Sequence, residues 1–119
     1  MKDDTFENLE VWQEAIELAA KVYDLLRDCR DFGFRDQMQK ASVSVSSNIA
    51  EGYERDSNAE FIRFLVIAKG SCGEVRSQAY LARRVKLLPL TDADGLIADA
   101  RRLSKRLARF IAVRREKFG

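Results

Sequence analysis

Few side chains in this sequence are suited to acid–base, nucleophilic or metal chemistry, because the chain contains no histidine. That absence excludes histidine general bases, catalytic triads that use histidine, and the glutamate–histidine pairs of di-iron helical bundles. The two cysteines, Cys29 and Cys72, are too far apart in sequence for a usual zinc motif. No glycine-rich phosphate-binding motif occurs. We therefore expect a protein that is not an enzyme and holds no cofactor; a metal site built only from Glu51, Glu60 and Glu74 is the alternative.

The same carboxylates fit a structural polar network better than a metal site. The predicted network consists of Asn48, Glu51, Ser71 and Glu74. The members of each pair are three residues apart, so each pair lies on one flank of a helix, and the two flanks could meet if the helices pack antiparallel. Buried carboxylates are costly unless they accept hydrogen bonds, so we expect hydroxyl, amide or arginine donors beside them. Such a network would fix the register of the helices without catalysing a reaction.

Basic side chains offer a second kind of chemistry, the binding of phosphates. Residues 61–119 hold 14 Lys and Arg against 5 Asp and Glu, a charge of +9, whereas residues 1–60 hold 7 against 14, a charge of −7. Five basic residues fall on one side of the last predicted helix: Arg101, Arg102, Lys105, Arg106 and Arg109. They could contact the backbone of RNA or DNA with weak sequence preference. Alternatively, they form a solvated face or pair with the acidic half, and the protein is a structural or protein-binding oligomer.

These side chains must be positioned by helices, because the apolar residues recur with helical spacing. The predicted helices span about residues 7–29, 35–54, 57–88 and 91–113. Gly33 is expected to interrupt the helical structure between the first two helices. A capping box at Ser57 begins the third helix, and residues 114–117 at the end of the fourth are expected to fray. Close approach of another backbone would explain Gly70 and Gly73 inside the third helix. The sequence thus predicts an all-α, antiparallel up-down-up-down four-helix bundle, a single domain over residues 1–119.

The first predicted helix carries two adjacent apolar stripes, although a member of a bundle needs only one broad face. The second stripe includes Trp12, Ile16 and Tyr23, and it predicts an interface with another copy of the chain. The alternative is that this helix lies deep in its own bundle.

No membrane segment is expected, because no apolar run approaches the ~20 residues that span a bilayer. The N-terminus, Met1-Lys2-Asp3-Asp4, is acidic and lacks the apolar core of a signal peptide. We therefore expect a cytoplasmic protein in which both cysteines are buried free thiols.

A series of linked motifs resembles a known family. These are Val11-Trp12-Gln13-Glu14-Ala15, then the run SNIAEGYERDS at residues 47–57, then Glu60-Phe61, Phe64-Leu65, Ile67-Ala68 and Gly70-Ser71 with Glu74. Together they are similar to the bacterial four helix bundle proteins, also called 23S rRNA intervening-sequence proteins because some are encoded in inserts within 23S rRNA genes. The resemblance covers about residues 6–90, and it departs at Ser46, where many members have proline.

The resemblance implies a homopentamer with no enzymatic activity and no cofactor. It also implies kinship with the accessory protein of diversity-generating retroelements, a basic pentamer regarded as binding nucleic acid and a reverse transcriptase. The term rRNA in the family name describes where some of the genes lie, and it does not define a function.

Overall fold

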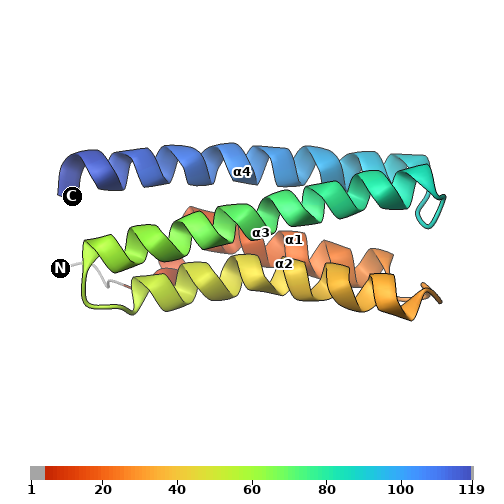
Figure 1. Ribbon diagram of the computed structural model, residues 1–119, viewed down its shortest axis with the longest axis horizontal. Coiled ribbons are helices and arrows are strands. Elements are labelled where there is room, and N and C mark those ends of the chain that lie inside the picture. Colours follow the sequence, from red (N-terminus) through yellow and green to blue (C-terminus); the bar gives the residue numbers. More distant parts are fainter. Residues whose placement is uncertain (1–4, 119) are drawn as a thin grey trace.

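Helices account for nearly all of the computed structural model, which describes residues 5–118. A short 3-10 turn, η1, spans Phe6–Asn8, and four helices follow: α1 Glu10–Leu25, α2 Phe32–Tyr53, α3 Asn58–Arg84 and α4 Leu90–Phe118. Successive helices run in opposite directions, so α1 begins and α4 ends at the same end of the molecule (Figure 1). Each helix packs against its neighbours in sequence, and α4 closes the bundle against α1. The predicted all-α, up-down-up-down four-helix bundle is confirmed, and the described part of the chain contains no strand.

The core consists of one apolar stripe from each helix, as the periodicity predicts. The fully buried side chains include Val22 of α1, Val45 of α2, Leu65 of α3 and Leu107 of α4. The serine–valine run at residues 42–47 is helical. Its two buried serines return their hydroxyls to backbone carbonyls three residues earlier, Ser42 to Gln39 and Ser46 to Val43, so these positions place no unsatisfied polar group in the core.

The corner between α2 and α3 contains most of the motifs that carry the family resemblance, and here they have structural roles. Gly52 packs so closely against α3 that a Cβ at this position would lie 2.5 Å from Cβ of Phe64. The guanidinium of Arg55 lies over the Phe64 ring at 4.8 Å. Ser57 caps α3 by accepting the backbone N–H of Glu60 at 3.1 Å, as predicted. The side chain of Glu60 does not complete the capping box, because it pairs with Arg63.

Three of the predicted boundaries are wrong. The first helix is shorter than expected, because residues 6–8 form a separate turn and α1 ends at Leu25. Gly33 does not interrupt the helical structure. It lies in the first turn of α2, where the Asp31 carboxylate caps the helix by accepting the N–H of Phe34. Residues 114–117, which were predicted to fray, are helical, and α4 ends at Phe118.

Three side-chain interactions hold the end of α4 in place. The amide of Asn58, at the start of α3, donates to the carbonyl of Arg114 at 3.2 Å. In return, Arg114 donates to the side-chain oxygen of Asn58 at 2.8 Å, and its guanidinium lies over the Phe61 ring at 5.0 Å. These contacts tie the last turns of α4 to the start of α3.

The expectations for the internal glycines and the cysteines need correction. No described atom lies within 4 Å of a Cβ built on Gly70 or Gly73, so within one chain neither glycine serves a close backbone approach. Cys72 is buried as expected, and its thiol donates to the carbonyl of Ala100, but Cys29 is only half-buried. Burial raises the pKa of the Cys72 thiol to about 11.

Candidate nucleic-acid interface

The five predicted basic residues of α4 do not form one continuous stripe, because carboxylates neutralise part of it. Arg102 pairs with Asp99 at 3.0 Å, one turn earlier on the same helix. Arg106 reaches across to α1 and pairs with Glu14 at 2.8 Å and Glu10 at 3.3 Å. The α1 side of α4 is therefore a poor surface for phosphates.

The groove between α1 and α4 on this side has more acidic than basic lining residues. Its charged lining residues are Glu14, Glu17, Lys21, Asp24, Asp99 and Arg102, four carboxylates against two cations. Lys21 and Asp99 form an ion pair of 2.7 Å. Partial burial raises the pKa of Asp99, but hydrogen bonds and charge from Lys21 and Arg102 outweigh burial and hold this pKa below its usual value.

The other side of α4 faces α3, and there the basic residues have a different environment. Arg101 and Lys105 of α4 line one groove together with Lys69 and Arg76 of α3, and the small residues Ser104 and Ala108 lie between them. The groove has a volume of about 390 Å³. Within residues 5–118, none of these four cations forms an ion pair with a carboxylate. We call these four residues the basic groove.

Helical spacing explains how the two helices form the basic groove. Lys69 and Arg76 are seven residues apart, so they lie on the same flank of α3, about 10 Å apart along its axis. Gly73 lies between them on that flank and leaves open space where a side chain would stand. Tyr80 follows one turn after Arg76, and its hydroxyl accepts a hydrogen bond of 2.9 Å from Arg101. The Tyr80 side chain is 39% exposed, so an aromatic surface adjoins the cations.

Sequence reasoning missed the contribution of α3 to this surface. The basic residues of α4 lie close together in the sequence, whereas Lys69 and Arg76 are separated by six residues without a positive charge and do not form a run. Their seven-residue spacing beside the buried Cys72 and Val75 was the available signal. Antiparallel packing of α3 on α4 then brings them to Arg101 and Lys105 (Figure 1).

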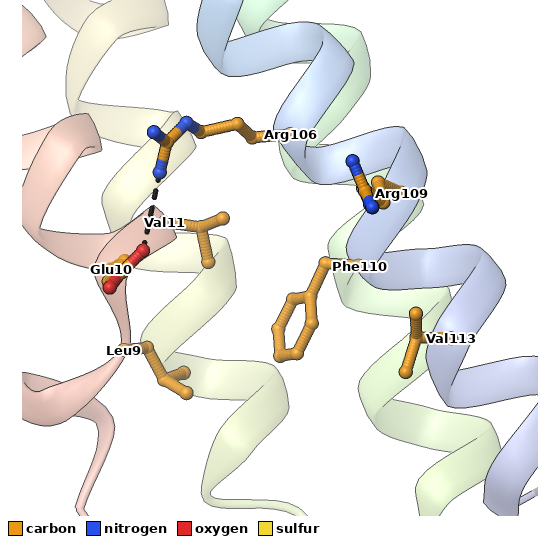
Figure 2. A pocket seen from close by; sticks show the side chains of 7 residues that line it. All are labelled: Leu9, Glu10, Val11, Arg106, Arg109, Phe110 and Val113. Carbon is orange, nitrogen blue, oxygen red and sulfur yellow. Dashed lines mark hydrogen bonds and ion pairs between the residues drawn. The ribbon is translucent and has the colours of Figure 1, made fainter.

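Arg109, the fifth predicted residue, belongs to neither groove. It lies beside an open cleft near the start of α1, lined by Leu9, Glu10, Val11, Arg106, Arg109, Phe110 and Val113. Figure 2 shows the side chains of Leu9 and Phe110 directed into the same space, with the ion pair between Arg106 and Glu10 at its rim. Among the described residues, Arg109 has no ion-pair partner.

The predicted polar network is smaller than expected, and its carboxylates lie outside it. Asn48 donates to the carbonyl and the hydroxyl of Ser44, at 2.8 and 2.9 Å, and the Ser44 hydroxyl lies 2.9 Å from that of Ser71. Ser44 thus links α2 to α3. Glu51 is instead exposed and pairs with Arg55 at 2.8 Å, and Glu74 is exposed. Both carboxylates lie on the solvent side of their helices, where water hydrates them and no buried donor is needed.

The three glutamates considered for a metal site do not come together either. Within residues 5–118, no group of three His, Cys, Asp or Glu side chains is placed to hold a metal ion. Glu60 interacts with arginines: its hydrogen bond with Arg63, together with the charges of Arg63 and Arg55, lowers the pKa of the Glu60 carboxyl.

No described helix has the length and apolar character needed to cross a membrane.

The second apolar stripe of α1 is partly buried and partly exposed. Trp12 is half-buried against the core, and its ring packs edge-on against Phe6 with centroids 5.2 Å apart. Ala19, three residues after Ile16 on the same flank, is buried, whereas the Ile16 and Tyr23 side chains are 37% and 44% exposed. Part of the stripe thus serves the bundle of a single chain, and the remainder is exposed.

Comparison with known proteins identifies the family. The sequence profile of the 23S rRNA-intervening sequence proteins matches residues 7–109. The chain belongs to this family. A search of curated proteins finds no match. Among solved structures, the chain is similar to a protein of unknown function from the S23 ribosomal protein family of Bacteroides thetaiotaomicron, with a TM-score of 0.80 and 23% sequence identity over 85% of this chain and 97% of that chain.

The comparisons support the fold and the family, and they leave the activity open. At 23% identity the structural likeness concerns the fold alone. Neither the family description nor the description of the neighbour names an enzymatic activity. A function must therefore be argued from the surfaces of this chain.

Proposed function

We propose that this member of the 23S rRNA-intervening sequence protein family is a non-enzymatic helical bundle that binds the phosphate backbone of RNA or DNA through the basic groove. The observation that carries the proposal is that four cations from two helices line one groove without carboxylate partners. Within residues 5–118, none of the four forms an ion pair with a carboxylate: Lys69, Arg76, Arg101 and Lys105. Each phosphate that such cations neutralise releases bound counterions, which favours binding.

The character of the groove determines what kind of binding is expected. Long cationic side chains contact phosphates and carry little information about base sequence. Weak sequence preference is therefore expected. Tyr80 supplies an exposed ring next to Arg101, to which its hydroxyl is hydrogen-bonded. The guanidinium of Arg83 also contacts this ring, at 5.2 Å from the ring centre.

The test uses fluorescence anisotropy with labelled RNA and DNA of mixed sequence. The groove variant carries Lys69→Gln, Arg76→Gln and Lys105→Gln. The matched control carries Arg30→Gln, Lys40→Gln and Arg84→Gln, which removes the same charge from exposed positions outside the groove. At about 50 mM salt we expect the groove variant to lose at least roughly tenfold in affinity, and the control to lose much less. Equal losses in the two variants would show nonspecific attraction to net charge and would refute the groove.

Self-association is the second proposed property, and it is favoured by the exposed part of the α1 stripe. Ile16 and Tyr23 are apolar side chains on one flank of α1 that the bundle leaves partly uncovered. We propose that they contact another copy of the chain in a homo-oligomer, with a pentamer as the expected size from the family resemblance. This property is also compatible with a purely structural or protein-binding role.

Light scattering tests self-association separately from nucleic-acid binding. A pentamer of the 13.6 kDa chain would be five times that mass. The double change Ile16→Ser and Tyr23→Ser should reduce the particle mass and leave the helical circular dichroism intact, because neither side chain is buried. A wild-type particle of monomer mass at micromolar concentration would refute the assembly and leave the basic groove to be judged by its own test.

A further inference from the structure

The end of the bundle where α1 begins holds an open apolar cleft that neither proposed property uses (Figure 2). α1 begins at Glu10, and the turn before it, Phe6–Asn8, packs against α1 and α2 and not against α4. α4 meanwhile continues to Phe118. The flank of α4 that α1 covers further along is therefore uncovered near Phe110 and Val113.

The walls of this cleft are apolar and firmly held. Leu9, which precedes α1, and Val11 in its first turn form one wall, and Phe110 and Val113 of α4 form the other. Phe110 is anchored by an edge-to-face contact with Phe61, with ring centroids 5.8 Å apart. The cleft has a volume of about 480 Å³, enough for one or two large side chains, and it is open along one edge. An open shape suits a segment of another chain better than a small molecule, which usually requires a deeper enclosure.

The charges around the cleft indicate the sign of the occupant. Arg106, on one rim, is already paired with Glu10 and Glu14. Arg109, on the neighbouring turn, has no carboxylate partner within residues 5–118. Residues 101–119 hold 8 Lys and Arg against 1 Glu, so this end of α4 is strongly positive. An occupant with a carboxylate next to its apolar anchor would satisfy both features.

We propose that this cleft is a docking site for an acidic amphipathic helix of a partner protein. An apolar side chain of the partner inserts between Leu9 and Phe110 and packs on Val113, while an adjacent carboxylate pairs with Arg109. The partner helix lies along α4 in the place where α1 is missing, so that it completes the bundle, as in other helix-in-groove interactions. The site faces the α1 side of α4, apart from the basic groove on the α3 side, and it does not depend on nucleic-acid binding.

The test uses synthetic peptides of about 15 residues, long enough to form a helix when bound. The probe peptide carries leucines at i and i+4 flanked by glutamates, and two matched peptides replace either the glutamates with lysine or the leucines with alanine. In anisotropy titrations at about 150 mM salt, wild-type protein should bind the probe peptide at least roughly tenfold more tightly than either matched peptide. Arg109→Glu should reverse the preference toward the lysine peptide.

Two further variants separate the cleft from general effects. Val113→Glu places a carboxylate in the cleft at a side chain that is 36% exposed, and it should weaken binding of the probe peptide by roughly tenfold while circular dichroism stays unchanged. Arg115→Glu makes the same charge change as Arg109→Glu on an exposed part of α4 outside the cleft, and it should alter binding less than about twofold.

Three results would overturn the proposal. The first is equal affinity for the three peptides, and the second is an equal effect of Arg115→Glu and Arg109→Glu, which would indicate nonspecific attraction. The third is a drop in particle mass for Val113→Glu in a protein that binds no peptide, which would show that a second copy of the chain occupies the cleft. The nucleic-acid affinity of Val113→Glu reports separately on the basic groove.

Discussion

Replacing Gly52 by alanine should destabilise the protein, although alanine normally strengthens a helix. Gly52 is buried in the last turn of α2, and an added Cβ would lie 2.5 Å from Cβ of Phe64 and 3.3 Å from the carbonyl oxygen of Phe61. Neither neighbour is the end of a flexible side chain, so α2 and α3 must move apart. Relieving such an overlap typically costs about 1–3 kcal/mol, whereas the helix-propensity gain from glycine to alanine is about 1 kcal/mol.

The cost of the overlap should exceed the helix-propensity gain, because moving α3 also disturbs the packing of Phe61 and Phe64, which are 5% and 7% exposed. We expect Gly52→Ala to lower the free energy of unfolding by up to about 2 kcal/mol, which is the upper clash cost of about 3 kcal/mol less the propensity gain of about 1 kcal/mol. Urea denaturation followed by circular dichroism measures this difference.

Gly70→Ala is the matched control for this experiment. Gly70 lies inside α3 with no described atom within 4 Å of an added Cβ, so only the propensity gain remains and stability should rise by about 0.5–1 kcal/mol. The reasoning would be refuted if Gly52→Ala were as stable as wild type. A Gly70→Ala protein that loses stability would show that another chain covers this face of α3.

Three other expectations follow from the side-chain interactions. Asn58→Ala removes both hydrogen bonds to Arg114, so hydrogen exchange in the last two turns of α4 should speed up, while exchange in the middle of α4 should not change. Asp99 has a lowered pKa in the folded protein, so its ion pairs add stability at pH values above its unfolded pKa of about 3.9, and this contribution is lost as the pH falls through its folded pKa. The stability difference between wild type and Asp99→Asn should therefore be constant above about pH 5 and shrink below it. A constant difference down to about pH 2 would contradict the assignment. Thiol-reactive reagents at pH 8 should modify the half-buried Cys29 well before Cys72, whose pKa is raised to about 11 by burial, and equal rates in the native protein would contradict this.

Much of the architecture could be predicted from the sequence, because helical periodicity and core burial are the same physical constraint. The stripes that contain Val22, Leu65 and Leu107 are buried as their spacing predicts. The helix ends were harder, since they depend on individual caps and ties. Nothing in the pattern alone shows that Asp31 caps α2 before Gly33, or that Asn58 holds the end of α4.

The candidate site was only half predictable, for a different reason. Local composition identified the basic residues of α4, but it does not show which of them meet a carboxylate from another helix. Arg106 meets Glu10 and Glu14 only because α1 packs beside α4, and Arg101 joins Lys69 only because α3 packs on the other side. Pairing across helices is a tertiary property, and it divides a stripe that appears continuous in the sequence.

The salt dependence of nucleic-acid affinity tests the central claim most directly. For a protein that binds phosphates through the basic groove, the logarithm of the binding constant falls linearly with the logarithm of salt concentration, and each lost contact to duplex DNA reduces the slope by about 0.9. The groove variant with Lys69, Arg76 and Lys105 changed to glutamine should therefore show a slope smaller by roughly 2.7 than that of wild type. The matched control with Arg30, Lys40 and Arg84 changed should keep the wild-type slope. Identical slopes for the two variants, or no measurable binding by wild-type protein at about 50 mM salt, would contradict the account.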